Sequence, residues 1–165
     1  MHPARAKVVG PLDGLAGSLG SIGVRFLIDG LDAGGRFALV EHPLPPRALA
    51  APLHRHSRED EYSFVLEGRL GALLGEEVVY GDPGDLVFKP RGQWHTFWNA
   101  GDTPARILEI ISPAGFESFF QELVARSAPS GGPEPAPAAL AARYGLEFDD
   151  SSVPRLLADH GLTFG

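Results

Sequence analysis

The sequence predicts an all-β domain, and three features support this. Glycine and proline are abundant, at 21 and 15 of the 165 residues, and they separate short apolar runs. Closely spaced runs with turn residues between them are typical of a sandwich or a small barrel. A helical period of apolar residues appears only after Ile111. The length suits one domain with a core of its own.

The expected strands follow one another between residues 23 and 111, and Gly75-Glu76 suits a hairpin tip between two of them. They span Gly23–Ile28, Arg36–His42, Leu49–Arg55, Tyr62–Glu67, Arg69–Leu74, Glu77–Tyr80, Asp85–Lys89, His95–Asn99 and Arg106–Ile111.

Helices are expected after the last strand. Ser112 suits an N-cap and Pro113 a first helical turn. The residues that follow form one apolar stripe at helical spacing, made of Phe116, Phe119, Phe120 and Leu123. Two shorter helices are expected over 136–144, ending at Gly145, and over 153–160, ending at Gly161.

These patterns divide the chain into three parts. Residues 1–126 form the β domain with its covering helix, and residues 127–137 form a linker rich in proline and glycine. Residues 138–165 form a short helical tail.

Composition narrows the classes of function. The net charge of −7 disfavours a nucleic-acid partner. No apolar run reaches the ~18 residues of a membrane span, and the first residues lack the apolar stretch of a secretion signal. The absence of cysteine excludes disulfides and thiolate chemistry. We therefore expect a cytoplasmic protein whose partner is a small molecule.

Four residues have spacings that suit a single metal ion: His54, His56, Glu61 and His95. Side chains at i and i+2 of a strand leave the same face, so His54 and His56 point together. Imidazoles with one carboxylate suit one divalent transition metal, namely Fe, Mn, Ni, Cu or Zn. One carboxylate leaves net positive charge on the ion, which favours an anionic or dioxygen-derived ligand.

Simpler readings exist for each of these residues. An isolated His-x-His is usually a surface or hydrogen-bonded pair. Glu61 follows Glu59 and Asp60, which together read as a solvated turn and offer alternative ligands. Strand parity favours Glu61, and it is the joint spacing that indicates a metal.

At these residues the chain resembles the cupin superfamily. The first cupin motif is matched at His54, His56, Glu61 and Gly68, with Ala48 in place of its leading glycine. The second motif is matched throughout, at Gly84, Pro90, Gly92, His95 and Asn99. The resemblance implies a cupin jelly-roll β-barrel with the C-terminal helices packed outside it. Small single-domain cupins of the quercetinase-like dioxygenase type look similar across both motifs.

Strand parity also suggests which side chains surround the metal. Phe97 shares the face of His95, Ser63 and Val65 share that of Glu61, and His42 lies on an inward position. We therefore expect these four in the substrate pocket.

The opposite face of the same strands is apolar. Tyr62, Phe64 and Leu66 form an outward row that needs cover. The phenylalanine helix is one candidate cover, and a second subunit in a homodimer is the other.

The leading functional hypothesis is a metal-dependent dioxygenase for a small phenolic, flavonol-like or diketone-like substrate. Glu61 is the candidate general base, since a buried carboxylate can be tuned toward neutral pH. A metal-dependent isomerase or decarboxylase is an alternative, and so is a non-enzymatic binding or sensor protein.

Overall fold

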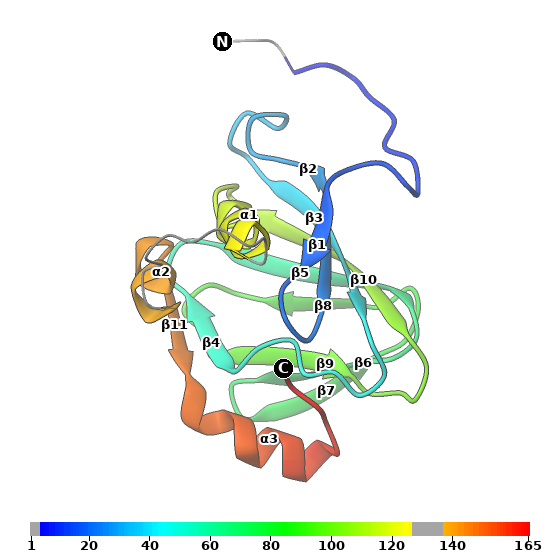
Figure 1. Cartoon of the computed structure of the whole chain (residues 1–165), viewed down its shortest axis with the longest axis vertical. Coiled ribbons are helices and arrows are strands. Elements are labelled where there is room, and N and C mark those ends of the chain that lie inside the picture. Colours follow the sequence, from blue (N-terminus) through cyan, green and yellow to red (C-terminus); the bar gives the residue numbers. More distant parts are fainter. Residues whose placement is uncertain (1–3, 127–136) are drawn as a thin grey trace.

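A computed structural model describes residues 4–126 and 137–165 of the chain. Two antiparallel sheets face each other, with the core between them (Figure 1). The all-β prediction is confirmed: among the described residues, strands far outnumber helices, as expected for a jelly roll.

The first sheet has six strands in the order β1-β2-β3-β10-β5-β8. These strands are β1 (Ala16–Ser18), β2 (Gly23–Ile28), β3 (Ala38–Leu44), β5 (Asp60–Glu67), β8 (Leu86–Lys89) and β10 (Ala105–Ser112). Burial alternates residue by residue along β10, so one face of this sheet points into the molecule and the other points outward.

The second sheet has five strands in the order β11-β4-β9-β6-β7. They are β4 (Leu53–His56), β6 (Leu70–Leu74), β7 (Glu77–Gly81), β9 (His95–Asn99) and β11 (Leu146–Asp149). In this sheet β4 lies between β9 and β11, so His54 pairs with His95 on one side and with Phe148 on the other. The strand that carries two candidate ligands is therefore supported from both sides.

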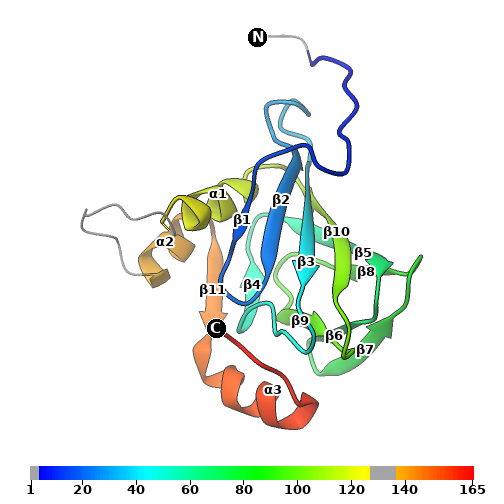
Figure 2. The same ribbon diagram turned by 45° about the vertical axis from the view of Figure 1, so that its right-hand side comes forward.

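The helices cover two different regions (Figure 2). Helix α1 (Glu117–Arg126) and helix α2 (Pro137–Arg143) pack on a core formed by both sheets. After a 3-10 turn (Asp150–Ser152), α3 (Val153–His160) packs on the outer face of the five-stranded sheet, against Trp98. Among the described residues, no helix is long and apolar enough to cross a membrane.

Several boundaries agree with the sequence, and some do not. β2, β9 and α3 have the expected bounds. Ser112 does not cap a helix: it ends β10, paired with Asp60, and α1 begins only at Glu117. The first helix is therefore shorter than expected, because strand pairing continues to Ser112. Most of the proposed linker lies outside the described residues.

Two strands were not expected from the sequence. β1 is short and made of small residues, and β11 lies in the tail, where only helices were expected. Both are edge strands whose hydrogen bonding depends on the neighbouring strand. β11 brings the C-terminal tail against β4, the strand that carries His54 and His56.

Candidate metal centre

Three histidines and one glutamate meet between the two sheets. One nitrogen or oxygen atom from each of His54, His56, Glu61 and His95 lies within 4.8 Å of those of the other three. All four residues are buried, with at most 6% of their surface exposed. The histidines come from β4 and β9, and Glu61 comes from β5 in the opposite sheet.

Hydrogen bonds to backbone carbonyls fix the tautomer and the orientation of two of the imidazoles. Nδ1 of His54 lies 2.8 Å from the carbonyl oxygen of Pro52, and Nδ1 of His95 lies 3.0 Å from that of Gln93. Because a carbonyl oxygen only accepts, each Nδ1 carries the proton and each Nε2 keeps a lone pair. This is the outer hydrogen bond that orients metal-binding histidines.

The Glu61 carboxylate lies close to two imidazole nitrogens, with room for a cation between them. Its Oε2 lies 3.4 Å from Nε2 of His56 and 3.4 Å from Nε2 of His95. Neither nitrogen has a hydrogen-bond partner among the described residues. A buried nitrogen lone pair and a carboxylate oxygen repel each other unless a proton or a metal ion lies between them.

The protonation states favour a metal ion in that position. Burial lowers the pKa of His56 to about 4 and that of His54 well below its ordinary value. Burial alone would raise the pKa of Glu61, but its charged neighbours, among them Lys89, outweigh burial and hold this pKa well below its ordinary value. Neutral imidazoles beside an ionised carboxylate are the form that binds a divalent ion. The four residues therefore fit a metal.

The two alternative acidic ligands lie elsewhere. Asp60 pairs with Arg91 at 2.8 Å, away from the histidines. Glu59 is buried, and its Oε2 lies 3.8 Å from Nδ1 of His56, on the other side of that ring from Glu61. Burial raises the pKa of Glu59 to about 7. Of the three acids, Glu61 alone completes the group.

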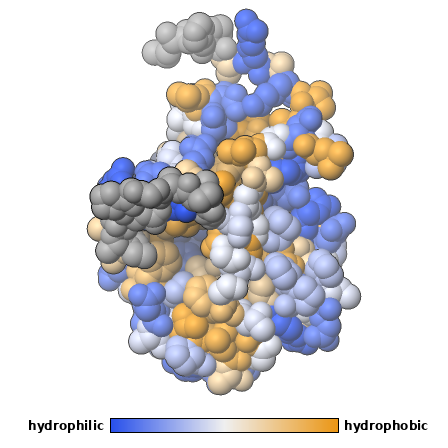
Figure 3. All heavy atoms as spheres, in the orientation of Figure 1, coloured by the Kyte–Doolittle hydropathy of each residue, from blue (hydrophilic) through white to orange (hydrophobic). Residues whose placement is uncertain are grey.

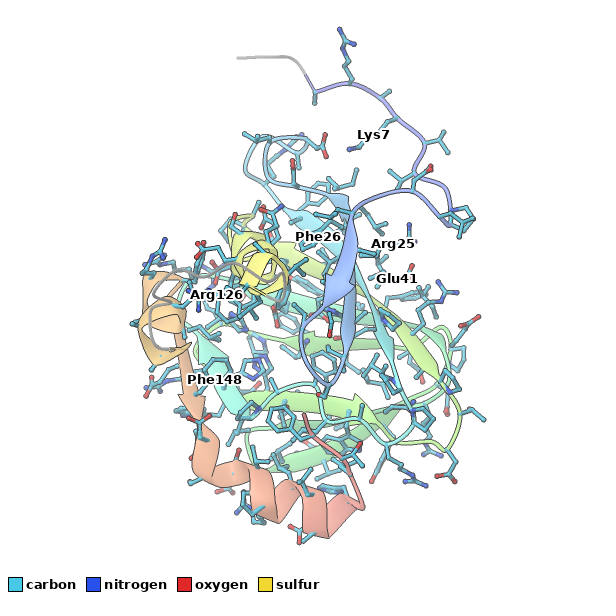
Figure 4. All side chains as sticks on the ribbon, viewed as in Figure 1. Lys7, Arg25, Phe26, Glu41, Arg126 and Phe148 are labelled. Atoms are coloured by element: carbon cyan, nitrogen blue, oxygen red, sulfur yellow. The ribbon has the colours of Figure 1, made fainter. Side chains whose placement is uncertain are left out.

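An apolar cavity opens onto this group. Its volume of about 210 Å³ exceeds the roughly 150 Å³ of an engineered cavity that binds benzene. His54 and Glu61 form part of its wall, and the phenylalanines that line it are Phe97, Phe116, Phe119, Phe120, Phe148 and Phe164. Figure 4 labels Phe148, which lies beside β4. The cavity can therefore hold an aromatic ring next to the candidate ligands.

The predicted pocket residues divide into two pairs. Phe97 and His42 line the cavity. Ser63 and Val65 point inward but do not line it: Ser63 is covered by its hydrogen bond to Glu109, and Val65 packs in the core. Strand parity correctly predicted that these two side chains point inward. It could not show that Glu109 and the core residues separate them from the cavity.

A buried ion pair beside the metal group was not predicted from the sequence. Nζ of Lys89 lies 2.6 Å from Oε1 of Glu109 and 3.4 Å from Oε2 of Glu61. Ser63 donates its hydroxyl to Oε2 of Glu109 at 2.6 Å. A signal existed, because Lys89 has the parity of Val87, and Glu109 has that of Ile107. Each places a charge at an inward position of an apolar strand.

Comparisons with known proteins agree with this geometry. A family model described as Cupin domain matches residues 41–111, which include all four candidate ligands. One curated relative is "Tetracenomycin polyketide synthase protein TcmJ" from Streptomyces glaucescens, 37% identical over 60 residues. That match covers 36% of this chain and only 40% of TcmJ.

Solved structures resemble the chain over a larger share of its length. The polyketide cyclase RemF from Streptomyces resistomycificus is 30% identical, with a TM-score of 0.56, over 66% of this chain and 80% of RemF. A predicted oxalate decarboxylase from Thermotoga maritima is 24% identical, with a TM-score of 0.53, over 56% of this chain and 80% of that one. The second likeness concerns the fold alone.

Proposed function

The chain belongs to the cupin superfamily, and on this basis we propose that it is a metal-dependent enzyme that cyclises a polyketone-like substrate with an aromatic end. The proposal combines a metal centre, an aromatic cavity and similarity to proteins named for polyketide chemistry. RemF is named a polyketide cyclase and TcmJ a polyketide synthase protein.

The observation that carries the proposal is that two members of the ligand group, His54 and Glu61, lie in the wall of the phenylalanine-lined cavity. His54, His56, Glu61 and His95 would hold the ion, which when bound supplies positive charge to the oxygen atoms of an enolate or phenolate. The phenylalanines would bind the apolar frame of the substrate and exclude water. Polyketones and phenols combine such a frame with chelating oxygens.

The buried charges favour an anionic form of the substrate. The cavity wall contains two carboxylates, Glu61 and Glu109, and both pair with one buried ammonium group, that of Lys89. A divalent ion changes this balance from one net negative to one net positive charge. The excess positive charge would stabilise the anion that 1,3-diketones and phenols form when they lose one proton.

Dioxygenation of the same substrate class is the second candidate. It is favoured by the ligand set, because three imidazoles and one carboxylate suit redox-active ions and leave positions open on a six-coordinate ion. Both candidates use the same cavity, so oxygen consumption separates them.

The test uses protein purified without added metal, whose metal content is measured by mass spectrometry. The protein is then incubated with a phenyl-terminated 1,3,5,7-tetraketone. An intramolecular aldol condensation forms one carbon–carbon bond and releases one water. We expect ring closure faster than in buffer and faster than with metal-stripped protein, without oxygen uptake. Oxygen uptake with cleavage of the substrate would favour the dioxygenase, and neither reaction would reject both candidates.

We also propose that the outer face of the six-stranded sheet binds a second copy of the chain. Leu86 and Phe88 on edge strand β8 are 54% and 48% exposed, and Phe64 on β5 is 36% exposed. Helix α1 does not cover this row, since it packs at the cavity instead. The charges nearby, Arg106 and Glu41, pair within the chain. An apolar, internally neutral face suits its own copy across a twofold axis.

A further inference from the structure

The buried pair of Lys89 and Glu109 has no evident structural need. Both side chains are at most 1% exposed, and each lies on the inner face of the six-stranded sheet. Burying two charges opposes folding unless the pair is well hydrogen-bonded, and apolar residues of similar size often serve stability as well or better. Retaining such a pair beside a cavity suggests a chemical role.

Glu109 is the member of this pair that reaches the cavity. It lines the cavity wall together with Glu61, His42 and Phe97. Its carboxylate is fixed from two sides: Oε1 lies 2.6 Å from Nζ of Lys89, and Oε2 accepts the Ser63 hydroxyl at 2.6 Å. A carboxylate held this way is positioned toward a bound ligand without being a ligand of the metal.

We propose that Glu109 is the general base of this enzyme and takes a proton from a ligand held in the phenylalanine-lined cavity. This inference rests on the proposed function. The proton leaves a carbon between two carbonyls, or a phenolic hydroxyl, and binds a Glu109 carboxylate oxygen, while the bond electrons stay on the ligand as an enolate or phenolate. In a condensation, that proton passes to the alkoxide formed from the attacked carbonyl. A second proton, taken from the same carbon, then passes to the departing hydroxide, which leaves as water.

Other titratable groups at the cavity are less suited to this role. Glu61 was expected to be the base, but it faces His56 and His95 and completes the metal group. His42 also lines the cavity, but burial lowers its pKa to about 4, which makes it a weak base. Lys89 lies against both carboxylates, which outweigh its burial and raise its pKa. Among the described lining residues, Glu109 is thus the carboxylate not occupied by the metal group.

The electrostatics of Glu109 favour a stronger base than an ordinary carboxylate. Burial raises the pKa of its carboxyl, and the charge of Glu61 adds to this rise, whereas Lys89 and Ser63 oppose it. The net shift is upward. A base is most effective when its pKa approaches the working pH.

The test measures proton removal directly, on metal-loaded protein with ethyl benzoylacetate as the probe. Exchange of its C2 protons for deuterium in D₂O is followed by proton NMR, and binding is measured separately by quenching of tryptophan fluorescence. Wild-type protein should accelerate exchange. Glu109→Gln should slow it by about 10²- to 10⁴-fold, the usual contribution of a general base. Metal content and affinity for the probe should stay close to wild type.

Two further variants make the result specific. Glu41→Gln removes a carboxylate from the outer face of the same sheet, where it pairs with Arg25 (Figure 4), and should leave exchange unchanged. Ser63→Ala removes one hydrogen bond to the charged form of Glu109, so the pH midpoint of exchange should rise. This second readout decides the matter if Glu109→Gln does not fold.

The outcomes separate the two proposals. Exchange by Glu109→Gln at the wild-type rate, or an unmoved midpoint in Ser63→Ala, would overturn the role of Glu109 and leave the proposed function standing. A wild-type protein that binds the probe without accelerating exchange would overturn both.

Discussion

The two faces of the six-stranded sheet depart locally, around β5, β8 and β10, from the usual distribution of polarity. Its inner face contains Glu61, Ser63, Lys89 and Glu109, all nearly or fully buried. Its outer face shows Phe64, Leu86 and Phe88, which are among the most exposed large apolar residues of the described strands. In an ordinary domain the hydrophobic effect would place the charged residues of these two sets outside and the apolar ones inside.

This arrangement indicates two different roles: the inner charged residues serve chemistry, and the outer apolar residues serve association. Charged groups inside a protein oppose folding, so their presence beside a cavity indicates a ligand or a metal. Apolar groups outside oppose solubility, so their presence on a sheet face indicates a partner. Elsewhere the surface is mixed: the face shown in Figure 3 has separate groups of apolar residues among polar ones.

The largest effect is expected from removing a ligand on the inner side. His56→Ala should reduce metal content to near zero and abolish the stabilisation by metal, which is about 4 kcal/mol when the metal is a thousandfold above its Kd. His160→Ala, at the end of α3 beside Trp98, is the matched control and should keep the metal. Mass spectrometry and thermal melting measure both, and full occupancy in His56→Ala would contradict the assignment.

The next largest effect concerns the buried ion pair. Lys89→Met leaves Glu61 and Glu109 buried without their ammonium partner, so metal-free protein should lose about 3–5 kcal/mol of unfolding free energy. The double variant Lys89→Met with Glu109→Gln removes the unpaired charge and should recover much of this loss. Urea denaturation measures both. If Lys89→Met is as stable as wild type, Lys89 does not stabilise the two buried carboxylates.

The pH dependence of stability tests burial at the cavity wall. Burial lowers the pKa of His42 from 6.5 to about 4. Between these pH values the unfolded chain binds a proton that the folded protein does not, so stability falls as pH falls, by up to about 1.4 kcal/mol per pH unit. Above pH 6.5 there is no contribution from His42.

His42→Asn should reduce that slope. Asparagine can still donate a hydrogen bond to the carbonyl of Gly23, as Nδ1 of His42 does, but it does not titrate. Urea denaturation of metal-free protein across this pH range gives the comparison, with His54 and His56 common to both proteins. Equal slopes would mean that His42 is not buried as described.

The smallest effect on the fold is expected on the outer face. Phe88→Glu places a charge beside Tyr62, on which Phe88 stacks at 4.9 Å between ring centroids. It should convert a dimer into a monomer while metal content stays unchanged, because Lys89 points to the opposite face. Light scattering with size-exclusion chromatography measures this. A wild-type monomer would refute the proposed interface.

The candidate ligands could be predicted from sequence because their spacing is local and each strand alternates strictly. His54 and His56 share a face by parity alone, and the second motif placed His95. Lys89 and Glu109 were not predicted because each is the one inward charge of its strand. Only the three-dimensional pairing of β5 with β8 and β10 brings them together.

The residues that line the cavity were less predictable, because tertiary pairing also decides which of them meet there. Phe148 reaches the cavity only because β11 pairs with β4, a long-range contact with no local signal. Phe116 was assigned to the helix stripe but precedes α1, and its ring lies edge-on to His56 with 4.3 Å between centroids. Local periodicity identifies apolar residues, but tertiary pairing decides which of them surround a ligand.

The central claim is that His54, His56, Glu61 and His95 bind one metal ion together between the sheets. Anomalous diffraction from crystals of metal-loaded protein, collected at the absorption edge of that metal, tests it most directly. We expect one strong peak per chain, within bonding distance of all four side chains. A peak elsewhere, or none from protein shown to contain the metal, would contradict this account.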